Sequence, residues 1–79
     1  MKDLHITNPV IHPNNEVGGC YVSRGTECPE WINVHVQQAR QRFPNETVDN
    51  AIRALAIEIF TMKEDFERIN SQRAFTGYQ

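Results

Sequence analysis

An unbroken heptad pattern in the second half of the chain constrains the fold more than any other feature. Seven apolar residues follow one another at alternating spacings of four and three, which places them along one side of a helix. They are Val48, Ile52, Leu55, Ile59, Met62, Phe66 and Ile69. This seam predicts a helix that packs along its length against another helix. No motif for chemistry is comparably clear.

The size and charge of the chain narrow the classes of function. With 79 residues the chain has room for one domain with a small core, and such a domain gains stability from additional buried area. The formal charge of -2, from 10 acidic residues against 8 Lys and Arg, is too balanced for electrostatic capture of nucleic acid or of an anionic membrane. We see no signal peptide and no membrane span of roughly 20 apolar residues. We therefore expect a cytoplasmic protein.

Residues 1–27 are predicted to form an extended arm or a β-hairpin. Leu4, Ile6 and Val10 lie at even spacings, as in a strand, and Pro9 restricts that strand to a sheet edge. A turn signal at residues 13–15 separates it from a second extended stretch over residues 17–23. Two adjacent glycines in that stretch argue against a stiff central strand.

The pattern that follows predicts a first helix over residues 28–43. Cys28 precedes a proline and so marks a boundary, while Pro29 and Glu30 suit the first turn of a helix. Apolar residues then repeat at spacings of four, three and four, at Ile32, Val36, Ala39 and Phe43.

A second helix is predicted over residues 46–72, followed by a short C-terminal tail within the region 28–79. Pro44 ends the first helix, and Asn45 is a good N-cap for the second. Because the connection is so short, the two helices are expected to run antiparallel. The predicted fold class is therefore mainly α: a two-helix hairpin with a short N-terminal extended arm or β-hairpin, its helices forming an oligomeric bundle.

The length of the second helix predicts a homo-oligomer, most simply a dimer. The helix would be roughly 40 Å long, whereas a compact domain of this size is about 30 Å across. The first helix covers only its first half, and its middle is apolar on more than one side. The residues expected at the oligomer seam are Ile57, Phe60, Met62, Phe66 and Ile69.

No group of residues in the sequence predicts catalysis or metal binding. Cys20, Cys28 and Ser23 lie near His35 in sequence, but no glycine elbow or oxyanion motif accompanies them. The three histidines lack the paired spacings of a metal site. We expect no catalytic residue, no metal and no cofactor, with both cysteines kept as thiols.

The order of elements over residues 19–60 resembles that of the ribbon-helix-helix repressors. A short strand over residues 19–24 is followed by two predicted helices, the second opening with TVDNAIR at residues 47–53. The resemblance implies a dimer whose two-stranded ribbon reads the major groove of DNA. Its readers would then be Tyr21, Ser23 or Arg24. The chain departs from the family in a long linker before the first helix and in the length of the second.

Aromatic and arginine side chains outside the seams are the candidates for contacting a partner, because these types anchor interfaces. They are Tyr21, Arg24, Trp31, Arg40 and Arg42. The leading hypothesis is a non-enzymatic binding protein, oligomeric through its helices, that modulates or inhibits a larger macromolecular partner. Short chains without motifs are typical of bacteriophage accessory and anti-defence proteins, which is an analogy of format only.

Two alternatives remain open at this point. One is the ribbon-helix-helix repressor. The other is an oligomer that holds a small polar ligand where subunits meet, using His12, Tyr21 and Arg24.

Overall fold

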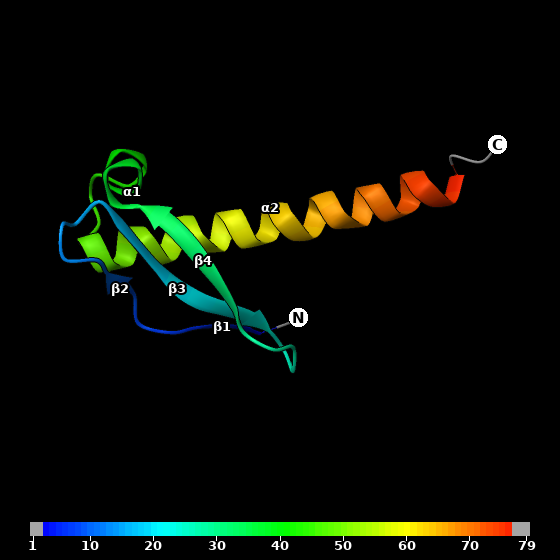
Figure 1. Cartoon of the computed structure of the whole chain (residues 1–79), viewed down its shortest axis with the longest axis horizontal. Helices are drawn as coiled ribbons and strands as arrows, with labels where there is room; N and C mark the ends of the chain where they lie inside the picture. The colour runs from blue at the N-terminus through cyan, green and yellow to red at the C-terminus, as the bar shows by residue number, and fades with distance from the viewer. Residues whose placement is uncertain (1–2, 77–79) are drawn as a thin grey trace.

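The protein has an α+β fold, in which a four-stranded antiparallel sheet packs against a long helix and a short one (Figure 1). This is a computed structural model, which describes residues 3–76 and the side chains of residues 3–70. In chain order the elements are β1 (Leu4–Ile6), β2 (Val10–Ile11), β3 (Val17–Arg24), β4 (Glu30–His35), α1 (Val36–Arg42) and α2 (Val48–Thr76).

Strand β3 is the centre of the sheet. It pairs with β4 along one edge and with both β1 and β2 along the other. β1 and β2 together form one edge strand, interrupted at residues 7–9, where Pro9 lacks the N–H that a ladder needs. The interruption is held against α2, because the Nη2 of Arg53 donates a 2.6 Å hydrogen bond to the Oδ1 of Asn8.

The core lies between α2 and one face of the sheet. Alternate residues of β3 and β4 point toward α2, as the two-residue period of a strand requires. From the helix side, Ile52 is completely buried and Phe60 is 4% exposed. The buried apolar residues are Cys20, Val22, Ile32, Val34, Val36, Ala39, Ala51, Ile52, Leu55, Ala56 and Phe60.

The prediction of a mainly α, two-helix hairpin is wrong. Residues 30–35, expected in the first helix, form strand β4, and α1 has only seven residues. Ile32 and Val36 satisfy a helical spacing, but with Val34 they also alternate with Trp31, Asn33 and His35. That alternation of β-branched and outward side chains is the pattern of a strand with one buried face. Residues 30–35 fit both a helix and a strand, and their pairing with β3 makes them a strand.

The second helix is present with shifted ends. It begins at Val48, and the Oγ1 of Thr47, not the side chain of Asn45, accepts the N–H of Asn50 at its start. It continues to Thr76, beyond the predicted end at residue 72, and the remainder of the expected tail, residues 77–79, lies outside the described residues. Among residues 3–76, no helix is both long enough and apolar enough to cross a membrane.

The heptad seam is divided between two environments. Its early members Ile52 and Leu55 are buried against the fold's own core, whereas Met62, Phe66 and Ile69 are exposed. Phe60, assigned to the oligomer seam, is instead buried in the monomer core, and Ile57 is partly buried. Figure 1 shows the reason, because α2 passes over the sheet and continues well beyond it.

The fold makes a prediction about Gly19, which lies in β3 on the face away from α2. A Cβ added there would lie 2.6 Å from the Cζ2 of Trp31 and would also meet the carbonyl oxygen of Ile32. Because the Ile32 carbonyl cannot withdraw without moving β4, and the indole cannot turn away without breaking its hydrogen bond to Asn33, Gly19→Ala should lower the free energy of unfolding by about 2 kcal/mol or more. Urea unfolding followed by the fluorescence of the single tryptophan measures this.

Gly25→Ala is the comparison variant for that measurement. Gly25 has a φ of +62° and no atom within 4 Å of an added Cβ, so the substitution should cost only about 1 kcal/mol of backbone strain. An equal or smaller loss in Gly19→Ala would contradict the contact between Trp31 and the glycine backbone.

Candidate functional site

The face of the sheet that points away from α2 is the candidate functional site. We call it the open face and define it by His5, Val10, Tyr21, Trp31, Asn33 and His35. All six are at least partly exposed, whereas the apolar residues of β3 and β4 that point toward α2 are buried. The strand register places them in adjacent rows, with Tyr21 opposite Trp31, Val10 and Asn33 on either side of Gly19, and His35 opposite Val17.

An aromatic pair occupies the middle of the open face. The rings of Tyr21 and Trp31 meet edge to face, with centroids 5.0 Å apart and planes at 71°. The indole Nε1 of Trp31 donates a 2.7 Å hydrogen bond to the Oδ1 of Asn33. Thr7 fixes the backbone beneath Tyr21, because its Oγ1 accepts the Tyr21 N–H and its own N–H donates to the Tyr21 carbonyl, both at 3.0 Å. Hydrogen bonds within the chain therefore hold the backbone of Tyr21 and the indole of Trp31.

The open face carries no formal charge among its strand residues. The two charged residues of the strands, Arg24 and Glu30, both face α2, where Arg24 binds Glu64 and Glu30 binds Lys63. An uncharged surface centred on Tyr and Trp has the composition of the core of a protein interface. Nucleic acid recognition would need cations that this face does not offer.

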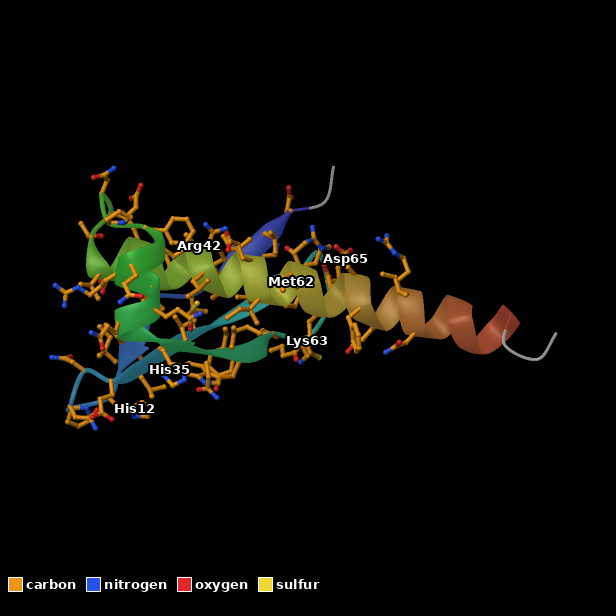
Figure 2. The ribbon with its side chains drawn as sticks, turned by 90° about the horizontal axis from the view of Figure 1, so that it is seen from above. His12, His35, Arg42, Met62, Lys63 and Asp65 are labelled. Atoms are coloured by element: carbon orange, nitrogen blue, oxygen red, sulfur yellow. The ribbon has the colours of Figure 1, made fainter. Side chains whose placement is uncertain are left out.

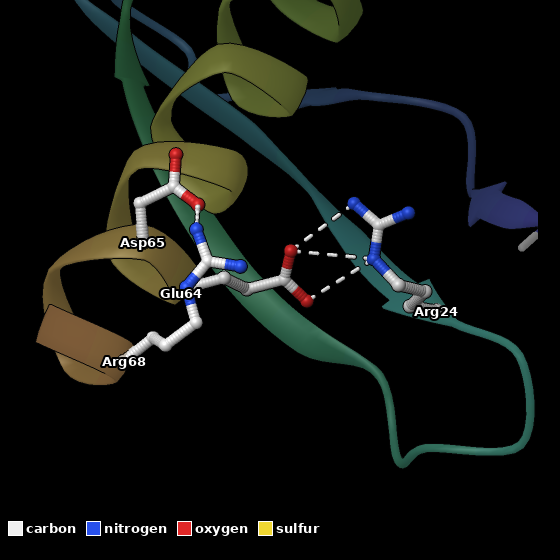
Figure 3. A network of polar contacts seen from close by, with 4 residues as sticks. All are labelled: Arg24, Glu64, Asp65 and Arg68. Carbon is white, nitrogen blue, oxygen red and sulfur yellow. Dashed lines mark hydrogen bonds and ion pairs between the residues drawn. The ribbon is translucent and has the colours of Figure 1, made fainter. Parts of the chain in front are cut away.

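The structure brings together two of the five predicted partner-binding residues and separates the other three. Tyr21 and Trp31 form the aromatic pair, 5.0 Å apart. Arg24 lies on the opposite face of the sheet, where its Nε and Nη2 donate to the Glu64 carboxylate at 3.1–3.2 Å (Figure 3). That hydrogen bond is the main cause that raises the pKa of Arg24 above its ordinary value.

The remaining two arginines lie on α1. Arg42 donates to the Glu58 carboxylate at 3.3 Å and stacks near the ring of Phe43. Arg40 is exposed to solvent. Since α1 crosses the beginning of α2 (Figure 2), neither arginine is part of the open face. The set His12, Tyr21 and Arg24, expected for a small ligand, is also divided, because Arg24 faces α2.

Four residues of the open face were not identified from the sequence as partner-binding: His5, Val10, Asn33 and His35. The signal for the last two is the alternation in β4, which puts them on the same face as Trp31. His35 and His12 lie at one end of the sheet on either side of Val17, as Figure 2 shows. Over residues 3–76 there is no group of three or more His, Cys, Asp or Glu side chains arranged to hold a metal ion.

Neither candidate cysteine lies beside His35, and Ser23 is opposite His5 in the pairing of β1 with β3, not beside His35. Cys20 is completely buried on the helix side of β3, and His35 is on the other face. Cys28 is exposed in the turn before β4, and His35 ends that strand. Seven residues of extended chain separate the two by about 23 Å. Burial raises the pKa of the Cys20 thiol, an effect that Arg53 partly offsets, so this thiol stays protonated.

Comparison with known proteins adds no functional information: the chain matches no protein family model, no curated protein and no solved structure. The properties of the open face therefore carry the functional argument.

The two cysteines should react differently with a thiol reagent. At neutral pH, iodoacetamide should modify Cys28 and leave Cys20 intact, because Cys20 is buried and holds its proton. Intact-mass spectrometry should show one adduct on the native protein and two after denaturation in urea. The Cys28→Ser variant should give no adduct until it is unfolded. Fast modification of Cys20 in the native state would contradict its burial.

Proposed function

We propose that the protein is a non-enzymatic, cytoplasmic binding protein that modulates a larger protein partner by docking the open face of its sheet onto it. The observation that carries the proposal is the pair of Tyr21 and Trp31 at the centre of an uncharged sheet face. Aromatic side chains supply large contact area at little cost in conformational entropy, particularly when hydrogen bonds already hold them.

The position of the charges favours a protein over nucleic acid as the partner. In the strands, both charged residues are neutralised on the helix side by Glu64 and Lys63. Phosphate contacts dominate the affinity of most nucleic-acid-binding proteins, and the open face has no lysine or arginine to neutralise a phosphate. Its apolar and amide groups suit another protein surface better.

The repressor alternative is not the one that we propose. In that family two copies pair their strands into a ribbon, which requires a strand with a free edge. Here β3 is paired on both edges within the chain, and Arg24, one of the expected base readers, binds Glu64 on the face covered by α2. The free thiols of Cys20 and Cys28 fit the cytoplasm, a reducing compartment, as the location that we propose.

Site-specific photo-crosslinking tests the proposal. Tyr21 is replaced by benzoylphenylalanine, the tagged protein is irradiated in a nuclease-treated lysate of its native cells, and the adducts are identified by mass spectrometry. We expect one defined protein to crosslink from position 21. The same photo-residue at Gln38, which is exposed on α1, is the matched control and should not capture that protein.

Binding of the captured protein is then measured with two further variants. Tyr21→Arg should weaken its affinity at least tenfold, about 1.4 kcal/mol, because it places a charge in the centre of the apolar face. Gln38→Arg introduces the same residue on α1 and should leave the affinity unchanged. Equal binding by both variants, or adducts that appear only with nucleic acid in untreated lysate, would exclude the open face as a protein-binding site.

A further inference from the structure

A second surface, separate from the open face, is left uncovered on α2. Met62, Phe66 and Ile69 lie at spacings of four and three along one side of the helix and are 67%, 65% and 49% exposed. We call these three residues the apolar stripe. They continue the heptad seam beyond Glu58, whose carboxylate binds Arg42 of α1, and the protein's own core does not cover them.

We propose that the apolar stripe binds a second copy of this chain, stripe against stripe, and so forms a homodimer through the projecting end of α2. This inference does not rest on the proposed function, because it uses a different surface and a different observation.

The exposed area of the monomer supports a partner of this kind. The chain exposes 6004 Å², whereas a compact monomer of 9.1 kDa exposes about 4,900 Å². The excess of about 1,100 Å² belongs to the elongated chain as a whole, and it is larger than the roughly 800 Å² that one partner buries in a standard interface. The radius of gyration is 14.8 Å, against about 12 Å for a compact domain of this length.

The charges beside the apolar stripe point to an uncharged partner. Lys63 binds Glu30, Glu64 binds Arg24, and Asp65 binds Arg68, whose Nη2 lies 3.0 Å from the Asp65 carboxylate (Figure 3). Because these four groups are paired within the chain, Glu67 is the one charged residue between Met62 and Ile69 that these pairs do not balance. A second copy supplies an apolar surface of the same kind.

The position of α1 leaves room for a second helix beside the stripe. Glu58 lies one turn before Met62 on the same side of α2, and its carboxylate binds Arg42 of α1. α1 therefore covers this side of α2 only as far as Glu58. A helix from a second copy that runs in the opposite direction can lie along the stripe, because pairing Phe66 with Phe66 places Glu58 of one copy opposite position 74 of the other, close to the end of α2 at Thr76.

Sedimentation velocity over a concentration series tests the dimer. The wild-type chain should show a reversible equilibrium between 9.1 kDa and twice that mass. Phe66→Gln should raise the dissociation constant at least tenfold, because each copy loses the central side chain of the stripe. Arg68→Gln introduces the same residue on the other side of the helix and should change the constant less than threefold.

The monomer fold should survive Phe66→Gln, because Phe66 is exposed and glutamine is a good helix former. Circular dichroism of each variant, recorded where it is monomeric, checks that the helix content is unchanged. A wild-type chain that stays monomeric at every concentration overturns the proposal. A dimer whose dissociation constant Phe66→Gln does not alter overturns it too, since its interface then lies elsewhere.

Discussion

Two adjacent glycines in the central strand set the distances on which the rest of the structure depends. Successive residues of a strand point to opposite faces, so Gly18 and Gly19 each leave space on a different side of the sheet. A Cβ at Gly18 would lie 3.1 Å from the Cδ1 of Ile52, and one at Gly19 would lie 2.6 Å from the Cζ2 of Trp31. Gly18 therefore leaves space for Ile52, the largest fully buried side chain of α2, and Gly19 leaves space for the indole of Trp31 at the centre of the open face. The core and the candidate site share one short segment of β3.

The far end of the same strand explains why α2 projects. Two ion pairs fasten the helix there: Glu64 binds Arg24 at the end of β3, and Lys63 binds Glu30 at the start of β4. From Ile52 to Glu64 the helix advances about 18 Å, and from Gly18 to Arg24 the strand advances about 20 Å. The two elements are thus matched in length between their attachment points. The residues of α2 after Glu64 continue beyond the sheet, so the sheet cannot cover Phe66 and Ile69, the last two residues of the apolar stripe.

The local sequence pattern was sufficient to predict α2 but not to predict β4. The heptad seam is long enough to specify a helix by itself, whereas residues 30–35 satisfy the spacing of a helix and of a strand, and only the pairing with β3 decides. The sequence likewise predicted only part of the candidate site. Tyr21 and Trp31 were selected by residue type and lie together, but Arg24 and Arg42 bind Glu64 and Glu58, which are 40 and 16 residues away. Contacts over such separations leave no periodic signal in the sequence.

The two exposed surfaces lie on different elements, and this separation has a consequence for affinity. The open face belongs to the side of the sheet away from α2, so a dimer formed at the apolar stripe would leave both open faces accessible. One Tyr and one Trp make a small contact, and a small contact alone gives weak binding. Two such faces held in one dimer would meet a partner with two sites at an effective concentration of about a millimolar. A short chain could therefore bind a much larger protein firmly through a modest surface, and loss of the stripe would weaken that binding without altering any residue of the open face.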